Sequence, residues 1–224
     1  VVLAETREQA DHAATLVRVR YESAPARTRF EEGKNSAYTP ESILVERNRL
    51  DKGDARRKLA EAAFKVDAVY RTPWENHNPI EPHAATIVWR DGKLIVHDAT
   101  QMINATAGSL AKVFGLKADE VHVSSPYVGG GFGAKAMWDH QILGAAAAKL
   151  AGRPVRVTLS RASMHRLVGG RMRTEQRVAL GADADGRLKA LLHHGYGVKP
   201  RHSVCDEGFS LTGRSLYASE CFDV

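Results

Sequence analysis

A glycine-rich segment, SSPYVGGGFGAK at residues 124–135, restricts the fold of this chain more than any other feature. It continues from the strand-like run VHVSS into an apolar, helix-like run that ends near Gly152. A loop that leads from a strand into a helix points backbone N–H groups at one place, which favours an anion or a polar ligand atom there. Glycines also keep side chains away from the main chain. The segment therefore predicts a loop that another group approaches closely.

The loop residues alone leave several interpretations open. A Walker A loop is disfavoured, because Ala134 interrupts the required Gly-Lys pair and no hydroxyl residue follows Lys135. The range Gly129 to Ala134 satisfies the dinucleotide pattern G-x-G-x-x-G/A, and Arg161, where a ribose-binding acid is expected, would make the ligand NADP. The structural alternative is a loop that only allows close helix-on-strand packing, with Phe132 as a core side chain.

The composition excludes several classes of protein. Of 224 residues, 43% are hydrophobic and 26% charged, an ordinary globular mixture for one large domain or two small ones. No apolar run approaches the ~20 residues of a membrane span, and no signal peptide is evident, so we expect a cytoplasmic protein, with the periplasm as the alternative. Interleaved charges and scattered tryptophans (Trp74, Trp89, Trp138) argue against nucleic acid. Cys205 and Cys221 are too far apart for a metal knuckle.

Hydrophobic periodicity predicts an α+β chain. A strand (1–5), a helix capped by Thr6 and a strand (17–22) precede a polar connection over 23–53, which we expect to hold a domain boundary. The elements expected after it are a helix from Ala55 to about Phe64, the strand VDAVYRT, a hairpin turning at Asp91-Gly92, a helix ending at Gly115, the strand VHVSS, a mostly buried helix, the strand VRVTLS, a helix capped by Ser160 and a hairpin turning at Asp185-Gly186.

The segment YVGGGFGAK resembles the signature loop G-G-G-F-G-x-K of the molybdenum hydroxylases, the xanthine dehydrogenase and aldehyde oxidase family. Residues Tyr70 to Gln101, with EPHA and the closing TQ, resemble the start of that family's first molybdopterin-binding domain. Residues Gly152 to Val178 resemble the stretch that follows the loop, and the first 22 residues are similar to the end of an α/β hammerhead domain. The resemblance is strongest to the bacterial branch with separate subunits.

The resemblance implies how the chain is organised. It implies an α+β fold: the tail of an α/β hammerhead domain over 1–22, a linker over 23–53, and over 54–224 part of the first molybdenum-cofactor-binding domain, with mixed sheet and helices. The chain would then be a fragment of a molybdenum-binding large subunit.

The resemblance also implies the site. In this family a pterin holds molybdenum without a protein ligand, so no metal-ligating residue is expected. Gly130, Gly131 and Gly133 would give backbone approach and donors to the cofactor, and Phe132 would place its amide near a molybdenum-bound oxygen. Gln101 would hydrogen-bond the apical oxo group. A dinucleotide form of the pterin is expected. The basic stretch 149–177, which holds eight Lys and Arg against one acid, is either a candidate phosphate surface or a solvated face that a neighbour covers.

The implied activity is hydroxylation of an aldehyde or N-heterocycle with water as the oxygen source, with iron–sulfur clusters and FAD on partner subunits. The family's catalytic glutamate and substrate-side arginine belong to parts of the large subunit that these residues do not match, so no catalytic residue is expected here and the chain alone is expected to be inactive. Ala136 replaces a glutamate found in some purine-oxidising relatives, which favours small aldehydes. An NADP-binding module and a non-catalytic assembly domain remain the alternatives.

Overall fold

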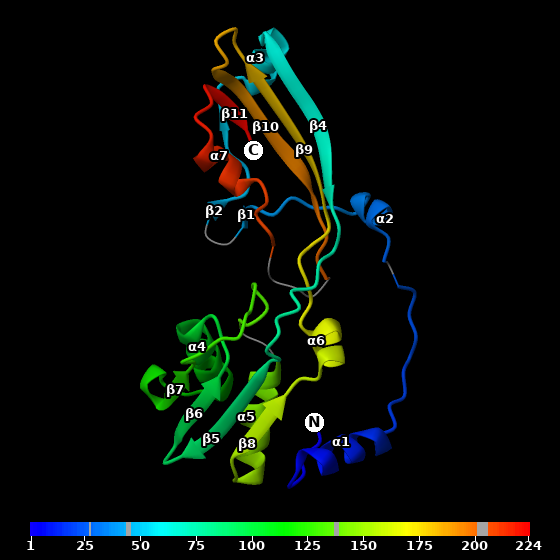
Figure 1. Cartoon of the computed structure of the whole chain (residues 1–224), viewed down its shortest axis with the longest axis vertical. Coiled ribbons are helices and arrows are strands. Elements are labelled where there is room, and N and C mark those ends of the chain that lie inside the picture. The colour runs from blue at the N-terminus through cyan, green and yellow to red at the C-terminus, as the bar shows by residue number, and fades with distance from the viewer. Residues whose placement is uncertain (27, 44–45, 137–138, 201–205) are drawn as a thin grey trace. The chain divides into compact units, whose positions relative to one another are not determined.

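The computed structural model describes residues 1–26, 28–43, 46–136, 139–200 and 206–224 (Figure 1). Trp138 and Cys205 lie outside these residues. The chain forms two compact units, each made of segments that are distant in sequence: Val1–Ser23 with Asn76–Gly170, and Ala24–Glu75 with Arg171–Val224. The domain limits implied by the resemblance, at 22 and 53, stay predictions. Among the described helices, none is long and apolar enough to cross a membrane.

The first unit is built on a four-stranded mixed sheet in the order β7-β6-β5-β8. Its strands are β5 (Ala84–Arg90), β6 (Lys93–Asp98), β7 (Val121–Ser124) and β8 (Val155–Thr158). The predicted hairpin β5–β6 is confirmed, and both turn residues have positive φ, 51° at Asp91 and 77° at Gly92, as a type I′ turn requires. Strands β6 and β7 are parallel, so their carboxyl ends lie at the same edge of the sheet.

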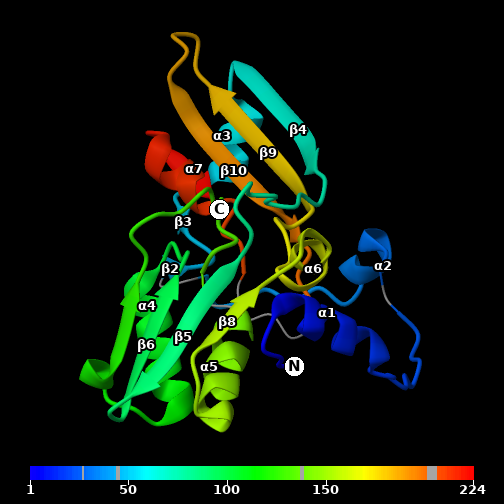
Figure 2. The ribbon, with the colours of Figure 1, turned by 60° about the horizontal axis from the view of Figure 1, so that its bottom comes forward.

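Two helices, α4 (Ile103–Phe114) and α5 (Asp139–Ala151), cover one face of this sheet (Figures 1 and 2). The buried residues that share the interface are Ala85, Ile87, Leu94, Val96, Leu110, Ala111, Val121, Val123, Ala145 and Ala148. Gly115, with φ 67°, ends α4 as predicted. Helix α5 is buried on one side only: most of its small residues are buried, whereas Leu143 and Leu150 are 48% and 89% exposed. The prediction of a mostly buried helix therefore holds for most of the small residues and not for these leucines.

The first unit also contains α1 (Arg7–Leu16), the short 3-10 helix η1 (Ala118–Glu120) and α6 (Arg161–Leu167). The predicted caps are confirmed: Thr6 forms a capping box with Gln9, and Ser160 Oγ accepts the N–H of Ser163 at 3.1 Å. The strands predicted at 1–5 and 17–22 do not form. Period-two alternation selects faces, but a strand also needs a hydrogen-bonded partner, and these residues pair with no strand in the described chain.

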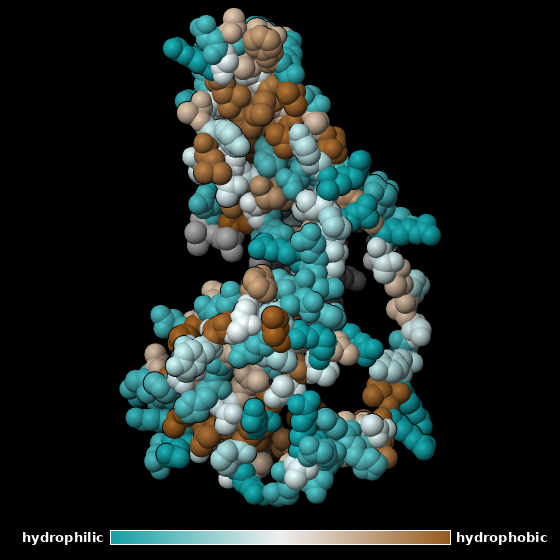
Figure 3. Space-filling model, in the orientation of Figure 1, coloured by the Kyte–Doolittle hydropathy of each residue, from teal (hydrophilic) through white to brown (hydrophobic). Residues whose placement is uncertain are grey.

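The second unit is built on a five-stranded sheet in the order β3-β11-β10-β9-β4. Figure 3 shows the hydropathy of the residues on the face of the chain that is in view. The strands are β3 (Asp51–Lys52), β4 (Phe64–Thr72), β9 (Thr174–Ala182), β10 (Leu188–Gly197) and β11 (Cys221–Asp223). The predicted β9–β10 hairpin is confirmed, and Ala55 of α3 (Ala55–Glu61) packs on the sheet beside the buried Cys221.

The region 23–53, expected to be a polar connection, contains short elements of its own. These are α2 (Phe30–Lys34), β1 (Ser42–Ile43) and β2 (Glu46–Arg47), together with β3. Phe30 is buried, and Lys34 forms an ion pair with Glu175 of β9, so part of this region packs within the second unit. These contacts could not be predicted from the polar composition of the region, because each depends on one or two side chains. The last helix of the unit is α7 (Leu211–Leu216).

Candidate functional site

The glycine-rich loop begins just after β7, and the segment that contains Gln101 follows β6. Because β6 and β7 are adjacent and parallel, the two segments leave the same edge of the sheet, where ligand sites of mixed and parallel sheets commonly lie. They are tied there by Ser125, whose hydroxyl donates to Thr100 O at 3.1 Å and accepts the Thr100 N–H at 3.0 Å. The strand order therefore brings the two predicted parts of the site together.

Gln101 holds the loop through its side-chain oxygen. Gln101 Oε1 accepts the N–H groups of Gly133 at 3.1 Å and Lys135 at 3.2 Å, and the Gln101 main-chain N–H donates to Lys135 O at 2.6 Å. A Cβ atom on Gly131 would lie 2.3 Å from Gln101 Oε1. The close approach of side chain and main chain thus requires glycine at 131.

The conformation of the loop depends on unusual backbone angles. Gly130 and Gly133 have φ of 86° and 94°, and Phe132, which is not a glycine, has φ of 55°. The Phe132 side chain is 65% exposed and lies over Gly130, where a Cβ would be 3.3 Å from the ring. The alternative in which Phe132 is a core side chain is therefore wrong.

The loop presents several hydrogen-bond donors without acceptors. Within the described residues, the N–H groups of Gly130, Gly131 and Phe132 have no acceptor, and neither does the Gln101 carboxamide nitrogen, because only its oxygen is engaged. The N–H of Gly133 is already used by Gln101. Three consecutive main-chain donors beside a side-chain donor suit a ligand that carries several acceptor oxygens or nitrogens. A pterin cofactor with its metal-bound oxygens has such acceptors, so these residues fit it.

Glu81 forms an ion pair with the buried Lys135, which follows the loop. Glu81 Oε2 also accepts the Gly129 N–H at 2.6 Å, while the Glu81 main-chain N–H donates to Gly129 O at 3.2 Å. Burial acts to raise the pKa of Glu81, but the hydrogen bonds from Lys135 and Gly129 outweigh it and leave the pKa below its ordinary value. No spacing rule predicts this pair, although Glu81 lies in the EPHA segment and Lys135 closes the loop motif.

A layer of buried polar residues supports the loop. His83, 1% exposed, donates from Nε2 to Ala134 O at 2.8 Å, and burial is the main cause of its lowered pKa. Thr100 Oγ1 contacts the carbonyl oxygens of Lys135 and Ala136, each at 3.2 Å. Asp98 accepts a hydrogen bond from the side chain of Gln141. Among the described residues, no three His, Cys, Asp or Glu side chains cluster as metal ligands.

The basic stretch 149–177 is partly paired with carboxylates, and its role as a phosphate surface stays a prediction. It is divided between the two units, and four of its arginines pair with carboxylates: Arg153 with Glu5, Arg171 with Glu207, Arg173 with Glu31 and Arg177 with Asp67. Arg161, on which the NADP interpretation depends, donates to the carbonyl oxygens of Pro79 and Ile80. The guanidinium of Arg161 is therefore committed to the protein's own main chain, which argues against NADP.

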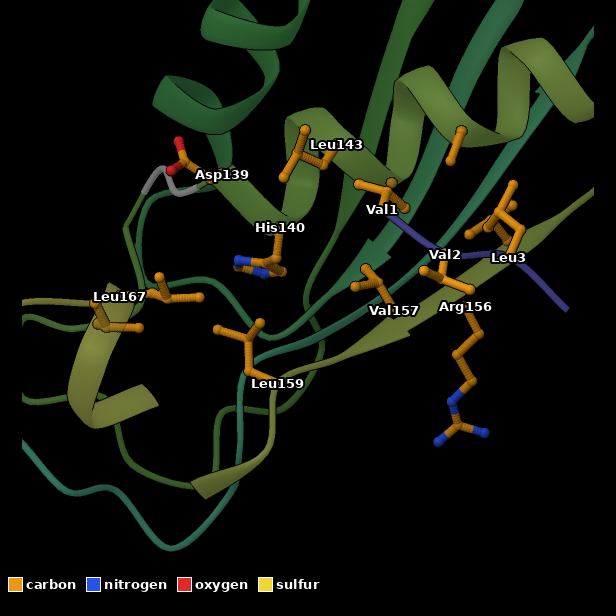
Figure 4. Close-up of a pocket in the computed structure, with 14 residues that line it drawn as sticks. Val1, Val2, Leu3, Asp139, His140, Leu143, Arg156, Val157, Leu159 and Leu167 are labelled. Carbon is orange, nitrogen blue, oxygen red and sulfur yellow. The ribbon is translucent and has the colours of Figure 1, made fainter. Parts of the chain in front are cut away.

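A separate cavity of about 160 Å³ lies in the first unit beside α5 and β8 (Figure 4). Leu143, Val157, Leu159 and His140 line it, and neither Gln101 nor any residue of the glycine loop does. The cavity is mainly apolar. It therefore does not belong to the candidate site.

Replacement of Gly131 by alanine tests the close approach at Gln101. We expect Gly131→Ala to destabilise the protein by about 1–3 kcal/mol, because overpacking displaces a neighbour or the backbone. Gly108→Ala in α4, where an added Cβ meets nothing within 4 Å, is the control and is expected to be neutral or stabilising. Urea unfolding measures both, and equal effects of the two substitutions would contradict the described contact.

The pKa of Glu81 gives a prediction about pH. A carboxyl group whose pKa is lowered by folding stabilises the folded state above its unfolded pKa, and this stabilisation is lost as the pH falls through the folded value. The difference in unfolding free energy between the wild type and Glu81→Gln is therefore expected to be constant above about pH 5 and to shrink below the ordinary value of 4.5. Unfolding curves from pH 7 to pH 3 measure it, and a difference that does not change with pH would refute the ion pair.

Comparison with known proteins assigns the family. A family model described as "Molybdopterin cofactor-binding domain" matches residues 37–205. The aldehyde oxidoreductase molybdenum-binding subunit PaoC of Escherichia coli (strain K12) is 36% identical over 197 residues, which cover 88% of this chain and 26% of the relative. Xanthine dehydrogenase/oxidase of Felis catus is 30% identical over 230 residues, which cover all of this chain and 17% of the relative.

The fold agrees with the sequence comparison. The structure of the aldehyde oxidoreductase from Desulfovibrio gigas superposes with a TM-score of 0.72 at 26% identity, over 87% of this chain and 22% of that chain. This chain spans about a quarter of the length of the PaoC relative that it matches. The expected resemblance to the molybdenum hydroxylases is thus confirmed, and the chain belongs to the molybdopterin cofactor-binding domain family.

Proposed function

We propose that this chain forms one wall of a molybdenum–pterin cofactor site in an oxidoreductase that hydroxylates an aldehyde or N-heterocycle with water as the oxygen source. The observation that carries the proposal is the contact of Gln101 with the bare main chain of Gly131 and Gly133, beside N–H groups that lack acceptors. When bound, the cofactor supplies the two-electron oxidation of the substrate carbon. The protein residues supply binding, orientation and polar contacts.

The two ends of the Gln101 carboxamide have different roles. Its oxygen is fixed by the Gly133 and Lys135 N–H groups, so its nitrogen is the end that remains to donate a hydrogen bond. The N–H groups of Gly130, Gly131 and Phe132 are the main-chain donors of the same site. Donors held in place before the ligand arrives need little reorganisation, which makes them effective in stabilising charge that develops during reaction.

The proposal extends to the substrate, the form of the pterin and the partner subunits. Similarity to PaoC, whose name gives an aldehyde oxidoreductase and a molybdenum-binding subunit, supports an aldehyde substrate, as does the alanine at 136. We propose a dinucleotide form of the pterin, with an iron–sulfur subunit and an FAD subunit as electron-transfer partners. The catalytic base would come from a part of the whole protein that this chain does not include, so the chain alone is expected to be inactive.

The substitution Gln101→Glu tests the assigned donor. Glutamate keeps an oxygen for the Gly133 and Lys135 N–H groups but has no nitrogen to donate. In the whole enzyme we expect the molybdenum and pterin content to be retained and kcat for an aldehyde to fall by about 10²–10³-fold, the usual cost of one lost donor at a site of developing charge. Metal analysis and steady-state kinetics measure the two quantities.

Gln9→Glu, an identical chemical change on the exposed helix α1, is the matched control and is expected to leave both quantities unchanged. Full activity of the Gln101→Glu enzyme would remove Gln101 from the proposed site. Absence of molybdenum and pterin from the wild-type enzyme would overturn the proposed function itself.

A further inference from the structure

The ammonium group of Lys135 depends on one carboxylate. The Lys135 side chain is fully buried, and within the described residues its ion-pair partner is Glu81, whose side chain is 38% exposed. A buried charge without a partner is strongly unfavourable. Glu81 therefore holds the lysine side chain in position, while Gln101 holds the main chain of the same residue.

The same carboxylate holds the entry of the loop. Glu81 Oε2 accepts the Gly129 N–H at 2.6 Å, and the main chains of the two residues form a second hydrogen bond of 3.2 Å. A Cβ on Gly129 would lie 2.6 Å from Glu81 Cβ, so the contact is as close as a glycine allows. Glu81 thus joins residue 129, where the loop begins, to residue 135, just after it ends.

Gln101 does not duplicate this connection. Its hydrogen bonds go to Gly133 and Lys135, at the exit of the loop, and in the described chain the entry at Gly129 is bonded only to Glu81. Without the Glu81 carboxylate, the entry of the loop would keep only the main-chain hydrogen bond from Glu81 N–H to Gly129 O. The donors of Gly130, Gly131 and Phe132 lie between the two ends.

We propose that Glu81 and Lys135 are positioning residues, whose ion pair closes the glycine loop and holds its three unpaired N–H groups in the arrangement that retains the cofactor. The part of this inference that concerns the cofactor rests on the proposed function. Closure of the loop concerns this chain alone. Neither side chain is assigned a contact with the substrate or the cofactor.

Hydrogen exchange at single-residue resolution in the whole subunit tests the closure. The reporter is the Gly133 amide, which donates to Gln101 and not to Glu81, so it reports on the loop rather than on the broken bond. In Glu81→Gln and in Lys135→Met we expect Gly133 to exchange at least about tenfold faster, with amides of β6 such as Val96 unchanged. We also expect bound pterin to be lost at least about tenfold faster from both variants.

The matched control is the exposed ion pair of the same unit, Glu5 with Arg153, replaced as Glu5→Gln and Arg153→Met, which is expected to change neither rate. If Glu81→Gln does not fold, Lys135→Met carries the test, because it removes the buried charge instead of leaving it unpaired.

Faster exchange at Gly129 alone, or equally at Gly133 and Val96, would overturn the proposal. An opened loop with unchanged pterin loss would overturn its cofactor part. A wild type without pterin would instead refute the proposed function, while the exchange rates still decide closure.

Discussion

The hydrogen bonds that converge on Gln101 Oε1 are the interaction on which the rest of the site depends. The oxygen accepts two main-chain N–H groups, from Gly133 at 3.1 Å and Lys135 at 3.2 Å, and so fixes the path of the loop. A Cβ at Gly131 would lie 2.3 Å from this oxygen, so a side chain there would displace the carboxamide. Because the oxygen is engaged, the carboxamide nitrogen is the end of Gln101 that remains to donate a hydrogen bond.

Strand order brings Gln101 beside the glycine loop. Adjacent parallel strands β6 and β7 end at one edge of the sheet, and each is followed directly by one part of the site. Helices α4 and α5 cover the sheet face and anchor the strands through a continuous apolar core. Beneath the loop, His83 donates to the carbonyl oxygen of Ala134, and Thr100 donates to that of Lys135. The apolar core fixes the strands, and the polar layer fixes the loop on them.

Local signals in the sequence predicted the elements that local chemistry determines. The Asp91-Gly92 turn, the Thr6 capping box and the Gly115 helix end each depend on a few neighbouring residues, and all are confirmed. Strands at 1–5 and 17–22 were wrongly expected, because alternation cannot reveal whether a partner strand is present. The candidate site came from the family resemblance and not from periodicity.

Long-range contacts were the part that sequence reasoning could not supply. Glu81 and Lys135 are separated by 54 positions, and no spacing rule connects them. In the basic stretch, Arg153 and Arg177 pair with Glu5 and Asp67, which distant segments supply. Net charge within a window therefore overstates the charge that a folded surface presents.

The most direct test of the account is the hydrogen exchange of the Gly130, Gly131 and Phe132 amides in the whole subunit, measured with and without bound molybdenum–pterin cofactor. If these N–H groups are the cofactor's donors, the bound cofactor slows their exchange at least about tenfold, while the Gly133 amide, already bonded to Gln101, changes little. Equal exchange of the three amides in the loaded and empty subunit would contradict the central claim.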